Sequence, residues 1–204
     1  MGESHADLDS YGAVVLAGGR ATRLGGFDKA SAEIGGRTLL EHALDAVVDA
    51  AEVVVVGEQV PTERPVSFVL ESPRWGGPVA ALLTGFDLLL RPSRLVVVIA
   101  VDMPHLTHRT IRRLCGAASG EGDSQPDGAV LVGPDQRPQL ALALRRDRLS
   151  DVRPDHEGQH GMSVRRLLAD LALVEVAAVE DEHRDVDTWA DLRDLRGEGR
   201  GSSE

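Results

Sequence analysis

The chain has little cysteine and no long apolar segment, the two features that would indicate a secreted or a membrane protein. Its 204 residues include a single cysteine, Cys115, so no disulfide can form within the chain. Residues 1–10 are polar and lack the charged start and apolar centre of a signal peptide, and no apolar run approaches membrane-spanning length. We therefore expect a cytoplasmic protein with no membrane partner.

Positive charge is also scarce, and lysine is the scarcest source of it. The formal net charge is −11, which argues against a nucleic-acid partner because surfaces that bind nucleic acid are normally basic. Of 22 basic residues, 21 are arginine and one, Lys29, is lysine. Lysine is a compact point charge and arginine a planar fork, so the two are not equivalent phosphate ligands. A lone lysine that ends a glycine-rich loop indicates a phosphate contact, although a single lysine must also fall somewhere by chance.

Length and apolar content set the number of domains that we expect. A chain of 204 residues with 42% hydrophobic content can bury one sizeable core but is short for two ordinary domains. We expect a single domain over residues 11–196, preceded by a flexible segment, 1–10, and followed by a disordered tail, 197–204.

Apolar runs rich in β-branched residues alternate with segments of helical periodicity. This alternation predicts an α/β fold with a mainly parallel, doubly wound sheet, helices on both faces and some antiparallel pairing late in the chain. The predicted strands are 13–17, 53–56, 66–70, 95–101, 129–132, 139–143 and 174–179. The predicted helices are 38–50, 78–90, 107–118, 163–171 and 188–195, several with a proline or hydroxyl start signal. Segments 119–128 and 145–161 are predicted to be loops.

The glycine-rich loop follows the first predicted strand. Residues 16–29 read Leu-Ala-Gly-Gly-Arg-Ala-Thr-Arg-Leu-Gly-Gly-Phe-Asp-Lys, and no acidic residue occurs from 10 to 27. Glycines such as Gly18 and Gly19 let the backbone turn with positive φ and approach a ligand closely. Such a turn outside the carboxyl end of a strand forms an anion site. Neither G-x-G-x-x-G nor a Walker loop is present, so the loop predicts a polyanionic small ligand bound by a different kind of site.

A second chemical position, Asp102, follows the apolar run 95–101. A carboxylate at the end of a buried parallel strand faces the ligand crevice, and we predict that Asp102 is a metal ligand. Magnesium on nucleotide phosphates takes one or two protein carboxylates, so a single aspartate is sufficient. The alternative is that Asp102 caps the following turn, but Thr107 is better placed to cap the next helix.

Several weaker features have both a functional and a structural interpretation. Gly76-Gly77-Pro78 could aim helix amides at a substrate or pack a helix start against the sheet. The histidine pairs 105/108 and 156/160 favour solvated loops over a zinc site, because no third ligand completes either set. Cys115 is expected to pack as a small apolar residue. The arginine pairs 112–113, 145–146 and 165–166 suggest solvated faces, although the last two flank a loop where an acidic substrate could be gripped.

The loop at residues 16–29 resembles the signature of the molybdenum cofactor guanylyltransferase (MobA-like nucleotidyltransferase) family. Other segments resemble the family in the same order, so that the likeness extends from residue 11 to 195. They are Gly-Pro-Val-Ala-Ala at 77–81, Asp-Met-Pro at 102–104, Gln-Leu-Ala-Leu at 139–142, and Asp-Val-Asp-Thr at 185–188 with Asp191.

The resemblance implies a three-layer Rossmann-like nucleotide-diphospho-sugar transferase fold, Mg²⁺ as cofactor, and GTP and molybdopterin (molybdenum cofactor) as substrates. The products would be a guanine dinucleotide cofactor and pyrophosphate, with cofactor-accepting apoenzymes as further partners. The implied catalytic residues are Lys29, Arg23 and Asp102. The implied nucleotide-binding residues are Leu16, Ala17, Gly18, Gly19, Lys29, Gly57, Glu71 and Asp102. The implied metal ligands are Asp102 and Asp187.

Departures from the family pattern fall on positions that read the substrate. Gly57-Glu58 stands where the family has an asparagine, Glu71 is the nearest equivalent of an aspartate, and Asp185 and Asp187 replace asparagines. Aspartate and asparagine differ in charge and in donor capacity. Two alternatives to a guanylyltransferase therefore stay open: a sibling enzyme that uses CTP or another phosphorylated acceptor, and a nucleotide-binding module without catalysis.

Overall fold

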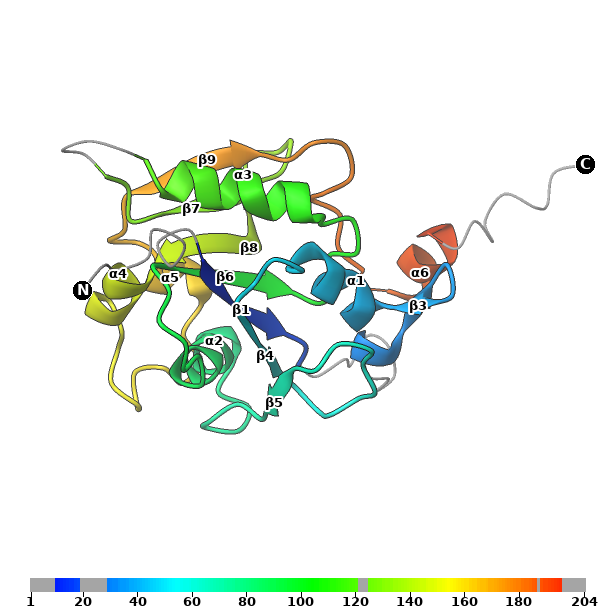
Figure 1. Cartoon of the computed structure of the whole chain (residues 1–204), viewed down its shortest axis with the longest axis horizontal. Coiled ribbons are helices and arrows are strands. Elements are labelled where there is room, and N and C mark those ends of the chain that lie inside the picture. Colours follow the sequence, from blue (N-terminus) through cyan, green and yellow to red (C-terminus); the bar gives the residue numbers. More distant parts are fainter. Residues whose placement is uncertain (1–9, 19–28, 121–124, 187, 196–204) are drawn as a thin grey trace, which may run out of the picture.

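The computed structural model describes residues 10–18, 29–120, 125–186 and 188–195, which form a seven-stranded sheet with helices on both faces (Figure 1). The strands lie in the order β5-β4-β1-β6-β8-β7-β9. Their bounds are β1 (Tyr11–Leu16), β4 (Glu52–Val56), β5 (Ser67–Val69), β6 (Leu95–Ala100), β7 (Gly128–Val132), β8 (Pro138–Arg145) and β9 (Leu173–Ala177). Strands β5, β4, β1 and β6 are parallel, and β8 runs antiparallel to β6 and β7. The predicted mainly parallel sheet with late antiparallel pairing is confirmed.

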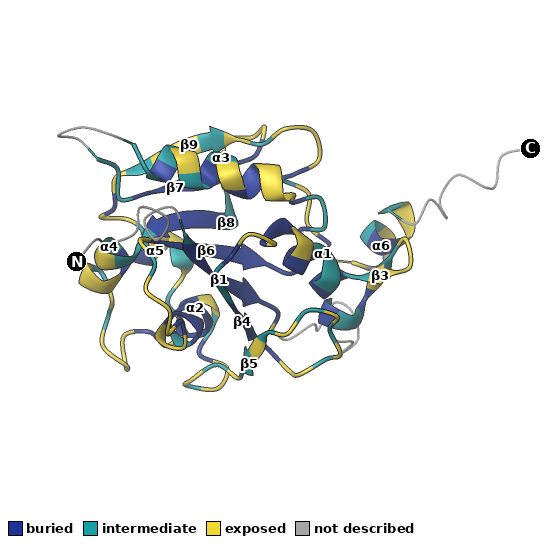
Figure 2. Cartoon of the chain, viewed as in Figure 1, coloured by how far each residue is buried: buried dark blue, intermediate teal, exposed yellow. Residues whose placement is uncertain are grey.

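The helices make two outer layers, one on each face of the sheet. Buried side chains of α1 (Leu39–Ala46), α3 (His108–Ala118) and α6 (Trp189–Leu195) join one core cluster. Those of α2 (Pro78–Asp87), α4 (Arg146–Asp151) and α5 (Val164–Leu167) join the other. Figure 2 shows the central strands buried, while α3 is buried on one side and exposed on the other. The three-layer Rossmann-like architecture that the sequence predicts is present.

Strand β1 shows why the central strands are recognisable in the sequence. Ala13 and Val15 pack into one cluster, and Val14 and Leu16 pack into the other. Because successive side chains of a strand point to opposite faces and both faces are covered, every position is apolar. Each buried valine or leucine contributes about 1.5–3 kcal/mol relative to an exposed one.

The predicted helix starts are confirmed by their caps. The Thr107 hydroxyl accepts a hydrogen bond from the Thr110 amide, which together with the reciprocal bond closes a capping box at the start of α3. Thr38 does the same for α1 through Glu41. Pro78 occupies the first turn of α2, where its missing N–H costs nothing.

Two loop predictions were wrong in part. Residues 146–151 form α4 inside the segment predicted as the loop 145–161, and Gly128 begins β7. The helix α4 has one buried apolar side chain, Leu149, among charged neighbours, so it carries no helical periodicity. The helix predicted to reach residue 50 ends at Ala46, and the apolar pattern continues because Val47 is buried without being helical.

A short segment between the glycine-rich loop and α1 was not predicted. It holds the 3-10 turn η3 (Lys29–Ser31) and the hairpin of β2 (Glu33–Ile34) with β3 (Arg37–Thr38). Gly35 and Gly36 join the two strands with φ of 60° and 79°, the pattern of a tight two-residue hairpin turn. The amide of Leu39 bonds to the carbonyl of Ala32 at 2.7 Å, which ties this segment to α1.

The predicted flexible start and disordered tail lie outside the described residues, apart from Ser10. Among the helices that the structure describes, none combines the length and the apolar content needed to cross a membrane.

Candidate active site

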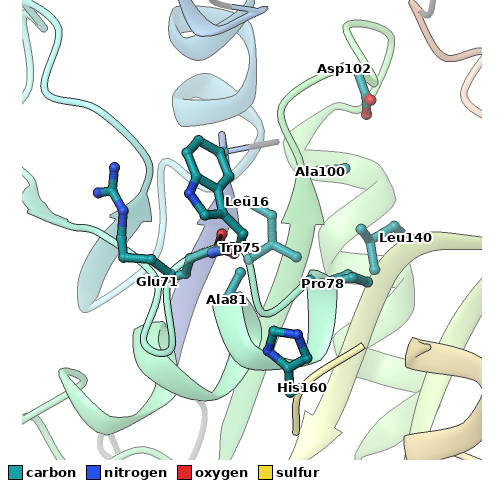
Figure 3. A pocket seen from close by; sticks show the side chains of 12 residues that line it. Leu16, Glu71, Trp75, Pro78, Ala81, Ala100, Asp102, Leu140 and His160 are labelled. Carbon is teal, nitrogen blue, oxygen red and sulfur yellow. Dashed lines mark hydrogen bonds between the residues drawn. The ribbon is translucent and has the colours of Figure 1, made fainter. Parts of the chain in front are cut away.

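A cleft of about 720 Å³ opens at the carboxyl ends of β1 and β6 (Figure 3). These strands are parallel neighbours, and their last residues, Leu16 and Ala100, are register partners. Ligands of open α/β sheets bind at this kind of edge, outside the carboxyl ends of the strands. The cleft is lined by Leu16, Gly18, Glu71, Arg74, Trp75, Gly77, Pro78, Ala81, Ala100, Asp102, Leu140 and His160.

Lys29 and Asp102, predicted from separate motifs, form an ion pair at this edge. Lys29 Nζ lies 2.9 Å from Asp102 Oδ2 although the residues are 73 positions apart in the chain. Their side chains are 21% and 23% exposed, so both are shielded and still reachable by a ligand. Lys29 opens η3, and Asp102 follows β6 after Val101, whose amide bonds to the Leu16 carbonyl at 3.0 Å. The pair puts a cation 2.9 Å from the carboxylate that borders the cleft.

The described part of the glycine-rich loop is bound to the neighbouring strand. The amides of Ala17 and Gly18 both donate to the carbonyl of Val56, at 2.9 and 2.8 Å. Both amide hydrogens are therefore engaged within the protein, and Gly18 borders the cleft as a residue without a side chain. The anion site predicted at this turn would therefore rely on groups other than the Gly18 amide, because β4 ends beside the turn and takes that hydrogen bond. Gly19 and Arg23 lie outside the described residues.

Gly57 supports the loop from behind and is not among the residues that line the described cleft. A Cβ at this position would lie 3.1 Å from the Ala17 Cβ and 3.2 Å from the Gly18 nitrogen. The Gly57 amide donates to the Val69 carbonyl at 2.9 Å. The absence of a side chain here allows the end of β4 to pack closely against the start of the loop.

The turn before α2 forms one wall of the cleft. Glu71 Oε1 accepts a hydrogen bond from the Trp75 amide at 2.7 Å, and the Gly76 amide donates to the Pro73 carbonyl at 2.9 Å. Gly77 caps α2 with φ of 90°, a conformation that favours glycine. Both interpretations of this segment fit the structure, because the glycines pack the helix start closely and the helix start borders the cleft.

The predicted C-terminal motif reaches the same edge of the sheet. The Val186 amide donates to the Asp102 carbonyl at 2.8 Å, so the segment that resembles the family's terminal motif runs beside Asp102. Asp187, the predicted second metal ligand, lies outside the described residues.

Glu182, which no sequence pattern predicted, anchors this terminal segment to α3. Its Oε1 accepts from Thr110 Oγ1 at 2.6 Å and its Oε2 from Arg113 Nη2 at 2.9 Å. Burial raises the pKa of Glu182, but the hydrogen bonds from Arg113, Thr110 and the Val179 amide outweigh it and the net pKa is lowered. Arg113 is thus a structural partner rather than part of a solvated face.

Trp75, Arg74, His160 and Leu140 also line the cleft and were not predicted. His160 reaches it because the Gly161 amide donates to the Gly76 carbonyl at 2.8 Å, which joins two loops 85 positions apart. No local pattern in the sequence indicates this contact, because a single backbone hydrogen bond between loops makes it. Glu71, in contrast, was predicted from the family resemblance and lies at the cleft with its carboxylate holding the turn.

Other chemical candidates have structural roles. Burial raises the pKa of the Cys115 thiol to about 12, as expected for a residue that packs as an apolar group. Burial lowers the pKa of His105, whose Nε2 is buried, so this histidine is less solvated than predicted. Arg145 and Arg146 lie at the start of β6, at the opposite end from Asp102, because Arg145 is the register partner of Leu95. They cannot grip a substrate in the cleft.

The donor set of the cleft fits magnesium better than zinc. No group of three or more histidine, cysteine, aspartate or glutamate side chains is gathered for a metal in the part of the chain that the structure describes. Asp102 offers a hard carboxylate at the cleft, which is the kind and number of protein ligand that magnesium on a nucleotide takes.

Sequence comparison finds relatives among curated guanylyltransferases. The chain is 33% identical over 116 residues to molybdenum cofactor guanylyltransferase of Bradyrhizobium sp. (strain ORS 278), a match to 53% of this chain and 55% of that protein. It is 28% identical over 202 residues to a probable molybdenum cofactor guanylyltransferase of Methanosarcina acetivorans, covering 90% of this chain and 86% of the relative. The chain thus spans little more than half the length of the first relative.

Solved structures with the same fold include enzymes of different substrate. Molybdopterin-guanine dinucleotide biosynthesis protein A from Archaeoglobus fulgidus superposes with a TM-score of 0.68 at 19% identity, covering 91% of this chain and 97% of that one. A 2-C-methyl-D-erythritol 4-phosphate cytidylyltransferase from Thermus thermophilus has a TM-score of 0.65 at 20% identity, covering 92% and 98%. At these identities the likeness establishes the fold.

The family model described as the MobA-like NTP transferase domain matches residues 13–177. This range includes Leu16, Gly18, the turn before α2 and Asp102, all of which border the cleft. The chain therefore belongs to the MobA-like NTP transferase domain family.

Proposed function

We propose that the protein transfers GMP from GTP to the terminal phosphate of molybdopterin, forming a guanine dinucleotide cofactor and releasing pyrophosphate. The observation that carries the proposal is the Lys29–Asp102 pair, 2.9 Å apart, at the carboxyl ends of β1 and β6. A carboxylate at the cleft with a cation beside it suits the phosphates of a nucleoside triphosphate bound with a metal ion. The similarity to curated guanylyltransferases supports GTP and molybdopterin as the substrates. We propose the cytoplasm as the site of this reaction.

The proposed reaction depends on positioning the two phosphate groups and neutralising their charge more than on a general base. In the proposed step an oxygen of the acceptor phosphate forms a bond to the α-phosphorus of GTP, and the bond from that phosphorus to the oxygen that bridges to the β-phosphorus breaks. The electron pair leaves with pyrophosphate. The second pKa of a phosphate monoester is about 6, so the attacking group is already largely dianionic at neutral pH. Lys29 neutralises charge that develops on the phosphates, and Arg23 is proposed to assist it.

Magnesium is the proposed cofactor. Asp102 would hold it, with Asp187 as a proposed second carboxylate. When bound, the ion neutralises phosphate charge and orients the phosphates. Lys29, which contacts Asp102 Oδ2, would orient that carboxylate and add its own positive charge at the same edge.

A sibling nucleotidyltransferase that uses CTP or another phosphorylated acceptor is the second candidate. It is favoured by Asp185, which stands in place of an asparagine beside the segment that bonds to the Asp102 carbonyl. A cytidylyltransferase also shares the fold. A non-catalytic nucleotide-binding module is the third candidate, and the presence of both Lys29 and Asp102 argues against it. Cofactor-accepting apoenzymes are proposed as partners that receive the product.

The test is pyrophosphate release by the purified full chain with Mg²⁺ and molybdopterin, with GTP, CTP, ATP and UTP assayed in parallel. We expect release with GTP, and loss of release in Asp102→Asn. Asp151→Asn is the matched control, because its carboxylate is 60% exposed and pairs with Arg148 on α4. Release with CTP in place of GTP would assign the protein to the sibling enzymes. Nucleotide binding without release from any of the four would support the non-catalytic module.

A further inference from the structure

Trp75 is a large aromatic side chain held at the entrance of the cleft. It is one of two tryptophans in the chain, and its side chain borders the cleft together with Glu71 and Arg74 (Figure 3). The residue is 56% exposed, so more than half of its surface is accessible from solution. An indole has a large apolar face and a polar edge, which suits it to contact a planar ring from solution.

The backbone that carries Trp75 is fixed in an unusual conformation. Trp75 has φ of 61°, in the left-handed region that bulky residues rarely adopt. The hydrogen bond from its amide to Glu71 Oε1, at 2.7 Å, and the one from the Gly76 amide to the Pro73 carbonyl, at 2.9 Å, hold the turn in place. Strained residues that the surroundings fix in this way occur mainly at functional sites.

Close packing against α2 fixes the turn further. A Cβ on Gly76 would lie 2.6 Å from the Ala80 Cβ and 2.8 Å from the Pro73 oxygen, so glycine is required where the turn meets the helix. The turn therefore cannot move away from α2 without losing this packing. The Trp75 side chain is presented from a rigid base, which lowers the entropy that a ligand contact would cost.

The ring itself is restrained by its neighbour. The Arg74 guanidinium lies 5.4 Å from the centroid of the Trp75 ring, within cation–π distance, and Arg74 also approaches Glu58 at 3.7 Å. The lining of the cleft also includes small or apolar residues, Leu16, Ala81 and Ala100. A restrained aromatic face and an apolar wall together suit a flat, uncharged ring rather than a phosphate.

We infer that Trp75 is a specificity-determining residue whose indole stacks on the base of the nucleoside triphosphate and favours a purine over a pyrimidine. The inference rests on the proposed function and adds the group that contacts the base. Phosphates bind at the Lys29–Asp102 end of the cleft, so the base occupies the end where the aromatic ring lies. The two-ring indole overlaps a two-ring purine more fully than a one-ring pyrimidine, and the stacking gain follows this overlap.

Removing an aromatic ring that stacks on a base weakens binding by roughly 5- to 150-fold. Trp75→Ala is therefore expected to raise the KM for GTP within this range, and Trp75→Phe to raise it less, because a smaller aromatic ring remains. The rise for CTP should be smaller than the rise for GTP. The KM for the acceptor and the inhibition constant of inorganic tripolyphosphate, which has no base, should stay unchanged in both variants.

Leu90→Ala is the control, because Leu90 is 81% exposed and is not among the residues that line the described cleft. An unchanged KM for GTP in Trp75→Ala would overturn the inference, and so would a tripolyphosphate constant that rises equally, since the turn would then be only structural. A rise confined to the acceptor would also overturn it. Equal rises for GTP and CTP would overturn the purine preference. If the wild type turns over GTP and Trp75→Ala leaves the KM for GTP unchanged, this inference fails and the proposed function stands. If GTP binding weakens in Trp75→Ala but the wild type shows no turnover, the proposed function fails and this inference stands.

Discussion

Replacing Lys29 with methionine should separate activity from stability. The substitution keeps an unbranched side chain and removes the charge that lies 2.9 Å from Asp102 Oδ2. At an effective dielectric constant of about 20, two unit charges at that distance attract by about 6 kcal/mol before solvation is counted. Because the side chains remain 21% and 23% exposed, water offsets most of this attraction. We expect the free energy of unfolding to change by about 1 kcal/mol or less.

The effect of Lys29→Met on catalysis should be much larger. A preorganised charge aimed at developing phosphate charge contributes about 2.7–4 kcal/mol to the transition state, a factor of roughly 100 to 1000 in kcat. Pyrophosphate release at saturating nucleotide measures kcat, and urea denaturation measures stability. Lys29→Arg keeps the charge but changes its shape, so its kcat should fall between those of the wild type and the methionine variant.

Two results would refute this reasoning. A kcat for Lys29→Met within about threefold of the wild type would mean that the lysine does not act on the phosphates. A loss of several kcal/mol in the free energy of unfolding would mean that Lys29 mainly holds Asp102 and the preceding turn in place.

Three further variants or probes test other parts of the structure. Gly85→Ala should lower the free energy of unfolding by about 1–3 kcal/mol in thermal denaturation, because its Cβ would lie 2.5 Å from Val14 Cγ1; an unchanged midpoint would contradict the packing. Glu182→Gln should destabilise the protein by about 1–3 kcal/mol at pH 7, because it loses charged hydrogen bonds from Arg113. Because the pKa of Glu182 is lowered in the folded protein, its contribution to the free energy of unfolding is fully present above the unfolded-state pKa of about 4.3. That contribution is lost as the pH falls through the folded-state pKa, so the stabilities of the wild type and Glu182→Gln should converge in acid. Burial raises the pKa of the Cys115 thiol to about 12, so iodoacetamide at pH 8 should label the native protein far more slowly than the urea-unfolded protein, and equal rates would count against that burial.

The fold follows largely from local patterns, because its central strands are buried on both faces. Strands β1 and β6 appear as continuous apolar runs, and parallel pairing places their carboxyl ends together. That topology is why two motifs as distant as Lys29 and Asp102 could be assigned to one site. The cap of α3 at Thr107 was predictable for a similar reason, because capping depends on residues close in the chain.

Features that depend on single long-range contacts were not predictable. The cleft position of His160 depends on one hydrogen bond between loops, from the Gly161 amide to the Gly76 carbonyl. The placement of Trp75 depends on a left-handed backbone conformation, which the conformational preference of tryptophan does not predict. The role of Glu182 depends on its hydrogen bond with Arg113, which lies 69 positions earlier in the chain. Composition and periodicity carry none of these contacts.

The most direct measurement uses GTP labelled at the α-phosphorus, and separately at the γ-phosphorus, with molybdopterin, Mg²⁺ and the purified protein. Nucleotidyl transfer predicts that the α label enters a product that contains molybdopterin while the γ label is released as pyrophosphate. Asp102→Asn should abolish both. Transfer of the γ label to the acceptor, or release of the γ label as free phosphate with no α label in a product, would contradict nucleotidyl transfer at the cleft between β1 and β6.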